Sequence, residues 1–348
     1  MQLNLRDLIA SPDHYLFAFE GGQASLMPMD RAAYERSIFL DRRIQPAGQQ
    51  MARIDAAQLA TVLDQARAPM AEIGWIFHVA HCGSTLLARA LDGPGDLVLR
   101  EPVVLRQLAV DAVNAGRDDA WAARLRLALR LLGRRYAPDA PVIAKANVPV
   151  NFIVDDLMTQ RPDAPAVFLY YPLETYLLAI LRSDNHRNWV MGVSTELKSE
   201  LDRREPCDAP PSAPAIAAAR LWLAQIRIYA DALNRYPNAV SLDAETLFSR
   251  PGPVLQAAGR HFGVAEDTKA LEATLAGPLF STYSKTPGVA FDNAARTARE
   301  AEQRTLLAAE LTVADQWVRS RLADRPLPDR LDRPLVGPAP VLISAARA

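Results

Sequence analysis

The chain has 348 residues and half of them are hydrophobic, so it can bury a substantial core and extensive disorder is excluded. Its 39 Lys and Arg residues are balanced by 40 Asp and Glu residues, which argues against a basic surface for nucleic acid or membranes. Two cysteines exclude a disulfide framework and a cysteine-based metal cluster. Because residues 1–13 lack the apolar run of a signal peptide, we expect a cytoplasmic protein.

The predicted elements begin with a small N-terminal extension, residues 1–73. In it, residues 15–26 predict a hairpin around Gly21 and Gly22, and residues 55–67 have helical periodicity. The main domain is expected over 74–323, where short apolar strands alternate with amphipathic helices. This pattern is typical of an α/β fold, a central parallel sheet flanked by helices.

The main domain is predicted element by element from this alternation. Strands are expected at 75–80, 96–100, 141–145, 166–171 and 239–243, and helices at 85–91, 121–136, 150–160, 173–182, 216–235 and 254–262. The charged, proline-rich residues 202–214 predict a loop, either a solvated connector or a lid. One long charged helix is expected over 294–323, and a proline-rich tail over 324–348 should lie on the surface or be disordered.

The segment that carries most chemical information runs from Gly74 to Leu87. A buried strand enters a turn at Gly83, and Ser84 and Thr85 open a helix. The first N–H groups of such a helix lack partners and lie at the positive end of its dipole, so they can bind an anion. The simpler interpretation of the same residues is a Ser/Thr helix cap behind a core strand.

This loop differs from that of a nucleoside triphosphatase. Ser84 stands where that motif requires Lys, and His78 stands where it requires its first Gly. A phosphotransferase that uses a nucleoside triphosphate stays open as an alternative function. It would require a metal, and no cluster of His, Cys and Asp residues has metal-ligand spacing. We therefore expect no metal.

Several motifs in this order resemble the sulfotransferase superfamily, above all the tyrosylprotein sulfotransferases and bacterial sulfotransferase-family proteins. The motifs are the strand and loop with His81-Cys82-Gly83-Ser84-Thr85-Leu86, then Leu91-Asp92, then Arg100-Glu101-Pro102, then Lys145 ahead of Pro149, and finally residues 241–247 followed by 251–263. The resemblance covers about residues 74–290. It implies a P-loop-like sulfotransferase fold.

The resemblance also implies a function for named residues. The donor would be 3′-phosphoadenosine 5′-phosphosulfate, and the acceptor a hydroxyl or amine of a small molecule or peptide. Glu101 would be the catalytic base, while His81 and Lys145 would stabilise the leaving oxygen. The residues implied to bind the nucleotide in the loop are Cys82, Gly83, Ser84, Thr85 and Leu86.

Each of these residues also has a structural interpretation. Glu101 ends a predicted strand, where α/β sheets build their clefts, but it could instead pair with Arg100 or Arg106. His81 could be held by a backbone carbonyl, and Lys145 could be solvated.

The chain departs from the family where the nucleotide's 3′-phosphate is gripped. The family's Arg-Asp-Pro reads Tyr170-Tyr171-Pro172 here, and its following Ser reads Leu178. Arg182, Ser183 or Lys285 would have to take over the 3′-phosphate. A non-catalytic relative that keeps the fold as an interaction module is therefore the second alternative.

Overall fold

The computed structural model describes residues 5–67, 72–93, 95–207, 213–283, 286–290 and 293–344. Its central sheet has five strands in the order β5-β6-β4-β7-β8, and every neighbouring pair is parallel. The strands are β4 (Gly74–His78), β5 (Leu97–Arg100), β6 (Val142–Lys145), β7 (Ala166–Tyr170) and β8 (Ala239–Asp243). The predicted α/β fold and its five strands are confirmed, and β4 lies in the middle of the sheet.

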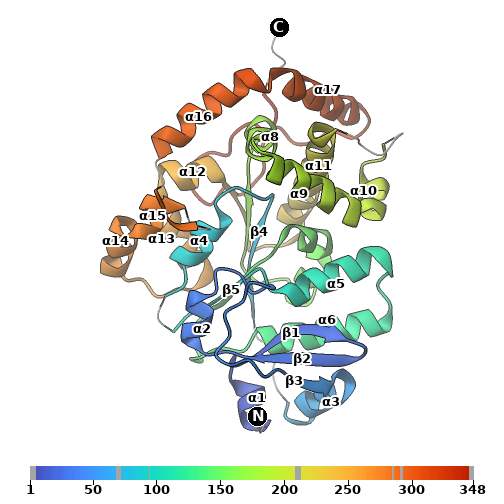
Figure 1. Ribbon diagram of the computed structural model, residues 1–348, viewed down its shortest axis with the longest axis vertical. Coiled ribbons are helices and arrows are strands. Elements are labelled where there is room, and N and C mark those ends of the chain that lie inside the picture. The colour runs from blue at the N-terminus through green and yellow to red at the C-terminus, as the bar shows by residue number, and fades with distance from the viewer. Residues whose placement is uncertain are drawn as a thin grey trace.

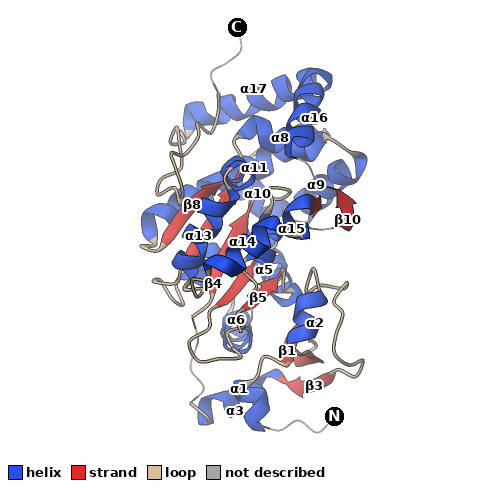
Figure 2. Cartoon of the chain, turned by 90° about the vertical axis from the view of Figure 1, so that its left-hand side faces the viewer, coloured by secondary structure: helices blue, strands red, loops and turns tan. Residues whose placement is uncertain are grey.

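Helices pack on the sheet on both sides (Figures 1 and 2). Those in the first part of the main fold are α4 (Ser84–Ala90), α5 (Val103–Asn114), α6 (Asp119–Leu132), the 3-10 helix η1 (Val148–Ile153), α7 (Val154–Met158), α8 (Leu173–Leu181), α9 (Asp184–Glu196), α10 (Lys198–Arg204) and α11 (Pro214–Arg235). Helix α11 is buried along most of its length because apolar residues recur around it. Its Trp222 is fully buried and donates its indole N–H to the carbonyl of Tyr171 at 2.9 Å.

The first residues form a second, smaller sheet. It consists of β1 (His14–Glu20), β2 (Gln23–Pro28) and β3 (Ala52–Asp55), all antiparallel, with helices α1 (Leu5–Ala10), α2 (Arg31–Arg36) and α3 (Ala56–Gln65). The predicted hairpin at residues 15–26 is confirmed. Helix α6 lies between the two sheets (Figure 2). Buried Arg134 holds the parts together, since its guanidinium donates to the carbonyls of Leu8, His14 and Leu131.

The remaining elements follow β8 in the chain. They are α12 (Ala244–Ser249), α13 (Pro251–Phe262), α14 (Thr268–Ala276), α15 (Pro278–Ser281), the antiparallel pair β9 (Thr282–Tyr283) and β10 (Thr286–Ala290), α16 (Asn293–Leu306) and α17 (Ala308–Asp324). The prediction of one helix over 294–323 is wrong, because the helix breaks at Leu307. Both halves contact α8, but α17 packs mainly along α11 (Figure 1).

Two further predictions need correction. Residues 202–204 belong to α10 and are not a loop, because Asp202 pairs with Lys198 within the helix and with Arg220 of α11. Of the predicted loop, residues 208–212 lie outside the described residues. The polar run that starts at Asp184 is the first part of α9, capped by the hydroxyl of Ser183.

The C-terminal segment, as far as it is described, lies across the surface of the main fold. Leu331 and Leu342 are each 1% exposed, and the amide of Ser241 in β8 donates to the carbonyl of Arg333. Backbone pairing at an otherwise open sheet edge therefore places this segment.

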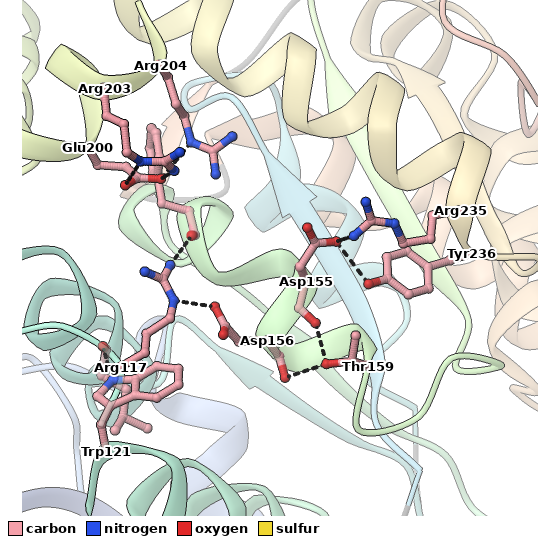
Figure 3. A network of polar contacts seen from close by, with 12 residues as sticks. Arg117, Trp121, Asp155, Asp156, Thr159, Glu200, Arg203, Arg204, Arg235 and Tyr236 are labelled. Atoms are coloured by element: carbon pink, nitrogen blue, oxygen red, sulfur yellow. Dashed lines mark hydrogen bonds and ion pairs between the residues drawn. The ribbon is translucent and has the colours of Figure 1, made fainter. Parts of the chain in front are cut away.

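A separate polar network surrounds α7 (Figure 3). Asp155 accepts hydrogen bonds from the Tyr236 hydroxyl and pairs with Arg235, while Asp156 pairs with Arg117. These contacts tie α7 to the end of α11 and to the segment before α6.

Candidate anion-binding site

The candidate site is built on the loop that follows the central strand β4. Three of its residues have a left-handed backbone: Ala80 (φ 84°), His81 (φ 51°) and Gly83 (φ 81°). Only glycine adopts this conformation without steric cost, and non-glycine residues held in it tend to cluster at functional sites. The loop is therefore a conformation that the surrounding fold imposes, at the carboxyl end of a parallel sheet where such folds place ligands.

Gly83 is required for a second reason. A Cβ atom at this position would lie 2.8 Å from Cζ of Phe248 and 3.2 Å from Cδ2 of Leu247. The backbone of Gly83 thus packs directly against α12. The positive φ and this close approach together disfavour a side chain.

Helix α4 starts at Ser84 with Gly83 as its N-cap, and no side chain caps it. The Ser/Thr cap that the sequence left open is therefore not what these residues form. Thr85 is 1% exposed, and within the described part of the chain its hydroxyl oxygen has no hydrogen-bond partner. A buried hydroxyl without a partner lowers the stability of the fold by about 1–3 kcal/mol. A ligand that formed a hydrogen bond with this hydroxyl would remove that cost.

The loop lines a cavity of about 310 Å³. Of the predicted residues, the structure brings together His81, Cys82, Gly83, Ser84, Thr85, Leu86 and Arg182 in its wall. The other lining residues come from α8, α9, α12, α15 and α16, and from Tyr171 and Thr282. In Figure 1 these helices surround α4 on the side of the molecule that α16 covers.

Helix α16 contributes residues that the sequence interpretation missed. Arg296, Arg299, Glu300 and Gln303 all line the cavity. The spacing of Arg296, Arg299 and Gln303 puts them on one helical face, which is the signal that could have identified them. It is a weak signal, because charged helices on protein surfaces commonly show the same spacing.

Arg296 is held by carboxylates. Its guanidinium binds both oxygens of Glu245 at 2.8 and 2.6 Å and also contacts Glu300 at 2.6 Å. Burial opposes its charge, but the hydrogen bonds to Glu245 prevail and raise the pKa of Arg296. Burial raises the pKa of Glu300, although Arg296 acts in the opposite direction. Arg182 and Arg299 also line the cavity.

Aromatic rings close one side of the loop. The imidazole rings of His81 and His186 lie 3.8 Å apart between centroids, and Trp189 packs edge-on against His81 at 5.2 Å. Nε of Arg182 lies 3.1 Å from Nδ1 of His186. Helix α9 thus brings a second histidine next to the predicted one.

Glu101 and Lys145 lie elsewhere at the same sheet edge, at the ends of β5 and β6. They form an ion pair with each other, and neither is among the residues that line the cavity. The Lys145 side chain is completely buried and is not solvated, and Glu101 is 18% exposed. Glu101 does not pair with Arg100 or Arg106, which bind Asp92 and Glu196. Its backbone is left-handed (φ 58°).

The residues at the family's 3′-phosphate positions are apolar or buried. Leu178 lines the cavity, and Tyr170 is fully buried, where burial and the charge of Asp243 raise its pKa. Lys285 lies outside the described residues. Among the residues that are described, no group of three or more His, Cys, Asp or Glu side chains could hold a metal ion.

No helix in the described ranges is both long and apolar enough to cross a membrane.

No protein-family model matches the chain, and no curated protein matches it in sequence. One solved structure that it is similar to is a sulfotransferase domain from the curacin biosynthetic pathway, with a TM-score of 0.40 and 15% sequence identity. That match covers 68% of this chain and 97% of the other.

Proposed function

We propose that the chain binds 3′-phosphoadenosine 5′-phosphosulfate in the cavity and transfers its sulfuryl group to a hydroxyl or amine. The observation that carries this proposal is the buried, unpartnered hydroxyl of Thr85 at the start of α4, in the wall of a cavity that also has Arg182 and Arg299. A neutral hydroxyl, helix amides and two guanidinium groups match a ligand with more than one anionic group.

Different residues would bind the two ends of the ligand. The amides and hydroxyls of Ser84 and Thr85 would hold the phosphosulfate end, and Arg182 or Arg299 would bind the second phosphate. His81 would donate a proton or hydrogen bond to the oxygen that leaves sulfur. In the reaction the acceptor oxygen or nitrogen bonds to sulfur as the bond between sulfur and the nucleotide's phosphate oxygen breaks. The acceptor's proton goes to the base.

Isothermal titration with adenosine 3′,5′-bisphosphate and adenosine 5′-phosphate tests the nucleotide. We expect the bisphosphate to bind at least about tenfold more tightly than the 5′-phosphate. Its second phosphate can form a hydrogen bond with a charged side chain, and such a bond contributes about 1.5–3 kcal/mol. Arg182→Ala should reduce that preference. Arg235→Ala removes an exposed arginine at the end of α11 that is not among the residues lining the cavity, and it should leave the preference unchanged. Equal affinities for both nucleotides in the unmodified protein would refute the proposed donor.

Glu101 is our candidate base, with Lys145 as its partner. Glu101→Gln should lower turnover at least about 100-fold, the lower end for general base catalysis, and should leave nucleotide affinity unchanged. A fully active variant would place the base elsewhere. Sulfuryl transfer from the donor to p-nitrophenol is a suitable assay, since the natural acceptor is not specified by the cavity.

A second candidate function is nucleotide binding without transfer. The position of Glu101 and Lys145 favours it, because both lie outside the cavity lining and Lys145 is buried in an ion pair. Tight binding of adenosine 3′,5′-bisphosphate without sulfuryl transfer to any phenol or amine would support this candidate over the enzyme.

A further inference from the structure

His186 has two polar neighbours on the same ring nitrogen. Its Nδ1 atom lies 2.9 Å from the carbonyl oxygen of Ala179 and 3.1 Å from Nε of Arg182. The carbonyl can only accept a hydrogen bond, and the guanidinium can only donate one. Nδ1 must therefore carry a hydrogen to bind Ala179 and must lack one to bind Arg182. The two contacts exclude each other.

The protonation of this nitrogen decides where Arg182 can donate. When Nδ1 lacks a hydrogen, it accepts from Nε of Arg182 and keeps the guanidinium against α9. When Nδ1 carries a hydrogen, it donates to the carbonyl of Ala179 and can no longer accept from Arg182. In the ring that has taken up a proton from solvent and carries a hydrogen on both nitrogens, the imidazolium charge also repels the guanidinium. Arg182 and His186 both line the cavity, so an anion there would receive the hydrogen bond that His186 no longer accepts.

Other charged groups surround this pair. On α9 itself, Asp184 and Arg187 flank His186, and Arg187 is neutralised by both oxygens of Glu310 in α17 at 2.6 and 2.8 Å. Helix α16 supplies Arg296, Arg299 and Glu300 to the same cavity. The loop supplies His81, whose ring centroid lies 3.8 Å from that of His186 with the two planes tilted by 38°. Two adjacent imidazoles beside arginines disfavour a second positive charge until an anion compensates for it.

We propose that His186 is a positioning residue for the anion site: binding of an anion is coupled to uptake of a proton at Nδ1 of His186, which transfers Arg182 from His186 to the ligand. This inference rests on the proposed function in that it assumes the anion to be the nucleotide. It predicts that the affinity of the protein for the anion increases as the pH falls, and that this increase depends on Arg182. The test spans about pH 5.5 to 8, the range in which histidine side chains commonly change charge.

Calorimetric titration with adenosine 3′,5′-bisphosphate tests the coupling. The unmodified protein should bind about tenfold tighter at about pH 5.5 than at about pH 8, since one linked proton gives up to a factor of ten for each pH unit. Titrations in buffers of different ionisation enthalpy should report proton uptake on binding. His186→Asn and Arg182→Gln should each flatten the pH profile, and the double variant should flatten it no further. His14→Gln, in the small sheet, is the matched control.

A pH-independent affinity, or a pH profile that survives His186→Asn, would overturn the inference while nucleotide binding itself still stood. Should no nucleotide bind at any pH, the proposed function fails, and the coupling is tested in the ligand-free protein. There the NMR signal of Arg182 Nε–H should shift with the titration of His186, and a signal that does not move overturns the inference.

Discussion

Replacement of Thr85 by Val has opposite expected effects on the stability of the ligand-free protein and on its affinity for an anion. The side chain is 1% exposed and its hydroxyl oxygen is buried without a partner among the described residues. Valine has nearly the same shape and removes the unpaired polar atom, which costs about 1–3 kcal/mol where it is buried. We therefore expect Thr85→Val to raise the free energy of unfolding of the ligand-free protein by about 1 kcal/mol.

The same change removes a hydrogen bond to a charged ligand. Such a bond contributes about 1.5–3 kcal/mol, which weakens binding about 10- to 150-fold. At a ligand concentration 100 times the dissociation constant, the unmodified protein gains about 2.7 kcal/mol. A variant with tenfold weaker affinity gains about 1.4 kcal/mol at the same concentration. The order of stability should therefore invert when adenosine 3′,5′-bisphosphate is added.

Thermal unfolding with and without the nucleotide measures both effects in one experiment. The matched control is Ser241→Ala, because Ser241 is equally buried but its hydroxyl donates to the carbonyl of Asp332 at 2.8 Å. That variant should lose stability and keep its affinity. A Thr85→Val protein that is less stable than the unmodified protein without ligand, or that binds the nucleotide equally well, would refute the assignment of this hydroxyl to an anion.

Three further variants test the fold around the site. Gly83→Ala should cost about 1–3 kcal/mol of stability and abolish nucleotide binding; Gly116→Ala, where φ is 93° but no atom lies within 4 Å of a Cβ, should cost less and leave binding intact. Arg134→Met should cost about 3 kcal/mol by leaving buried carbonyls unpaired, and limited proteolysis should then release the N-terminal segment; unchanged urea midpoints would contradict this. The hydrogen bonds from Arg187 lower the pKa of Glu310 below its ordinary 4.5, so this pair stabilises the fold above that pH and ceases to as the pH falls through the lowered value. Glu310→Gln should accordingly lose up to about 1 kcal/mol at neutral pH and nothing in acid, as measured by urea titration at each pH.

The α/β architecture could be predicted from the sequence because it follows from local patterns. Residues 142–144 and 166–170 are short apolar runs that are buried on both faces, and such runs are typical of strands in a parallel sheet. The loop after β4 could be predicted as well, because a glycine between a buried strand and a helix that opens with Ser84 and Thr85 is a local signal.

Other features depend on contacts between distant segments. Residues 294–323 were predicted as one helix, but the helix breaks at Leu307 and its second half packs mainly along α11, a contact that the local sequence does not specify. Residues 202–204 contain charges and precede prolines, yet a pair with Arg220 in α11 holds them in a helix. Local helix propensity gives no information about such partners, because they lie in distant segments of the chain.

The sequence by itself determined the sheet, the loop after β4 and the start of α4, because each is encoded in neighbouring positions. Only the tertiary structure decided which other side chains share the cavity. It brought Arg299 and Gln303 from α16 and His186 from α9 to the loop, and it placed Glu101 and Lys145 in an ion pair outside the cavity lining. The physical reason is that the cavity wall is assembled by packing between helices as far apart in the chain as α4 and α16, and packing depends on the whole fold.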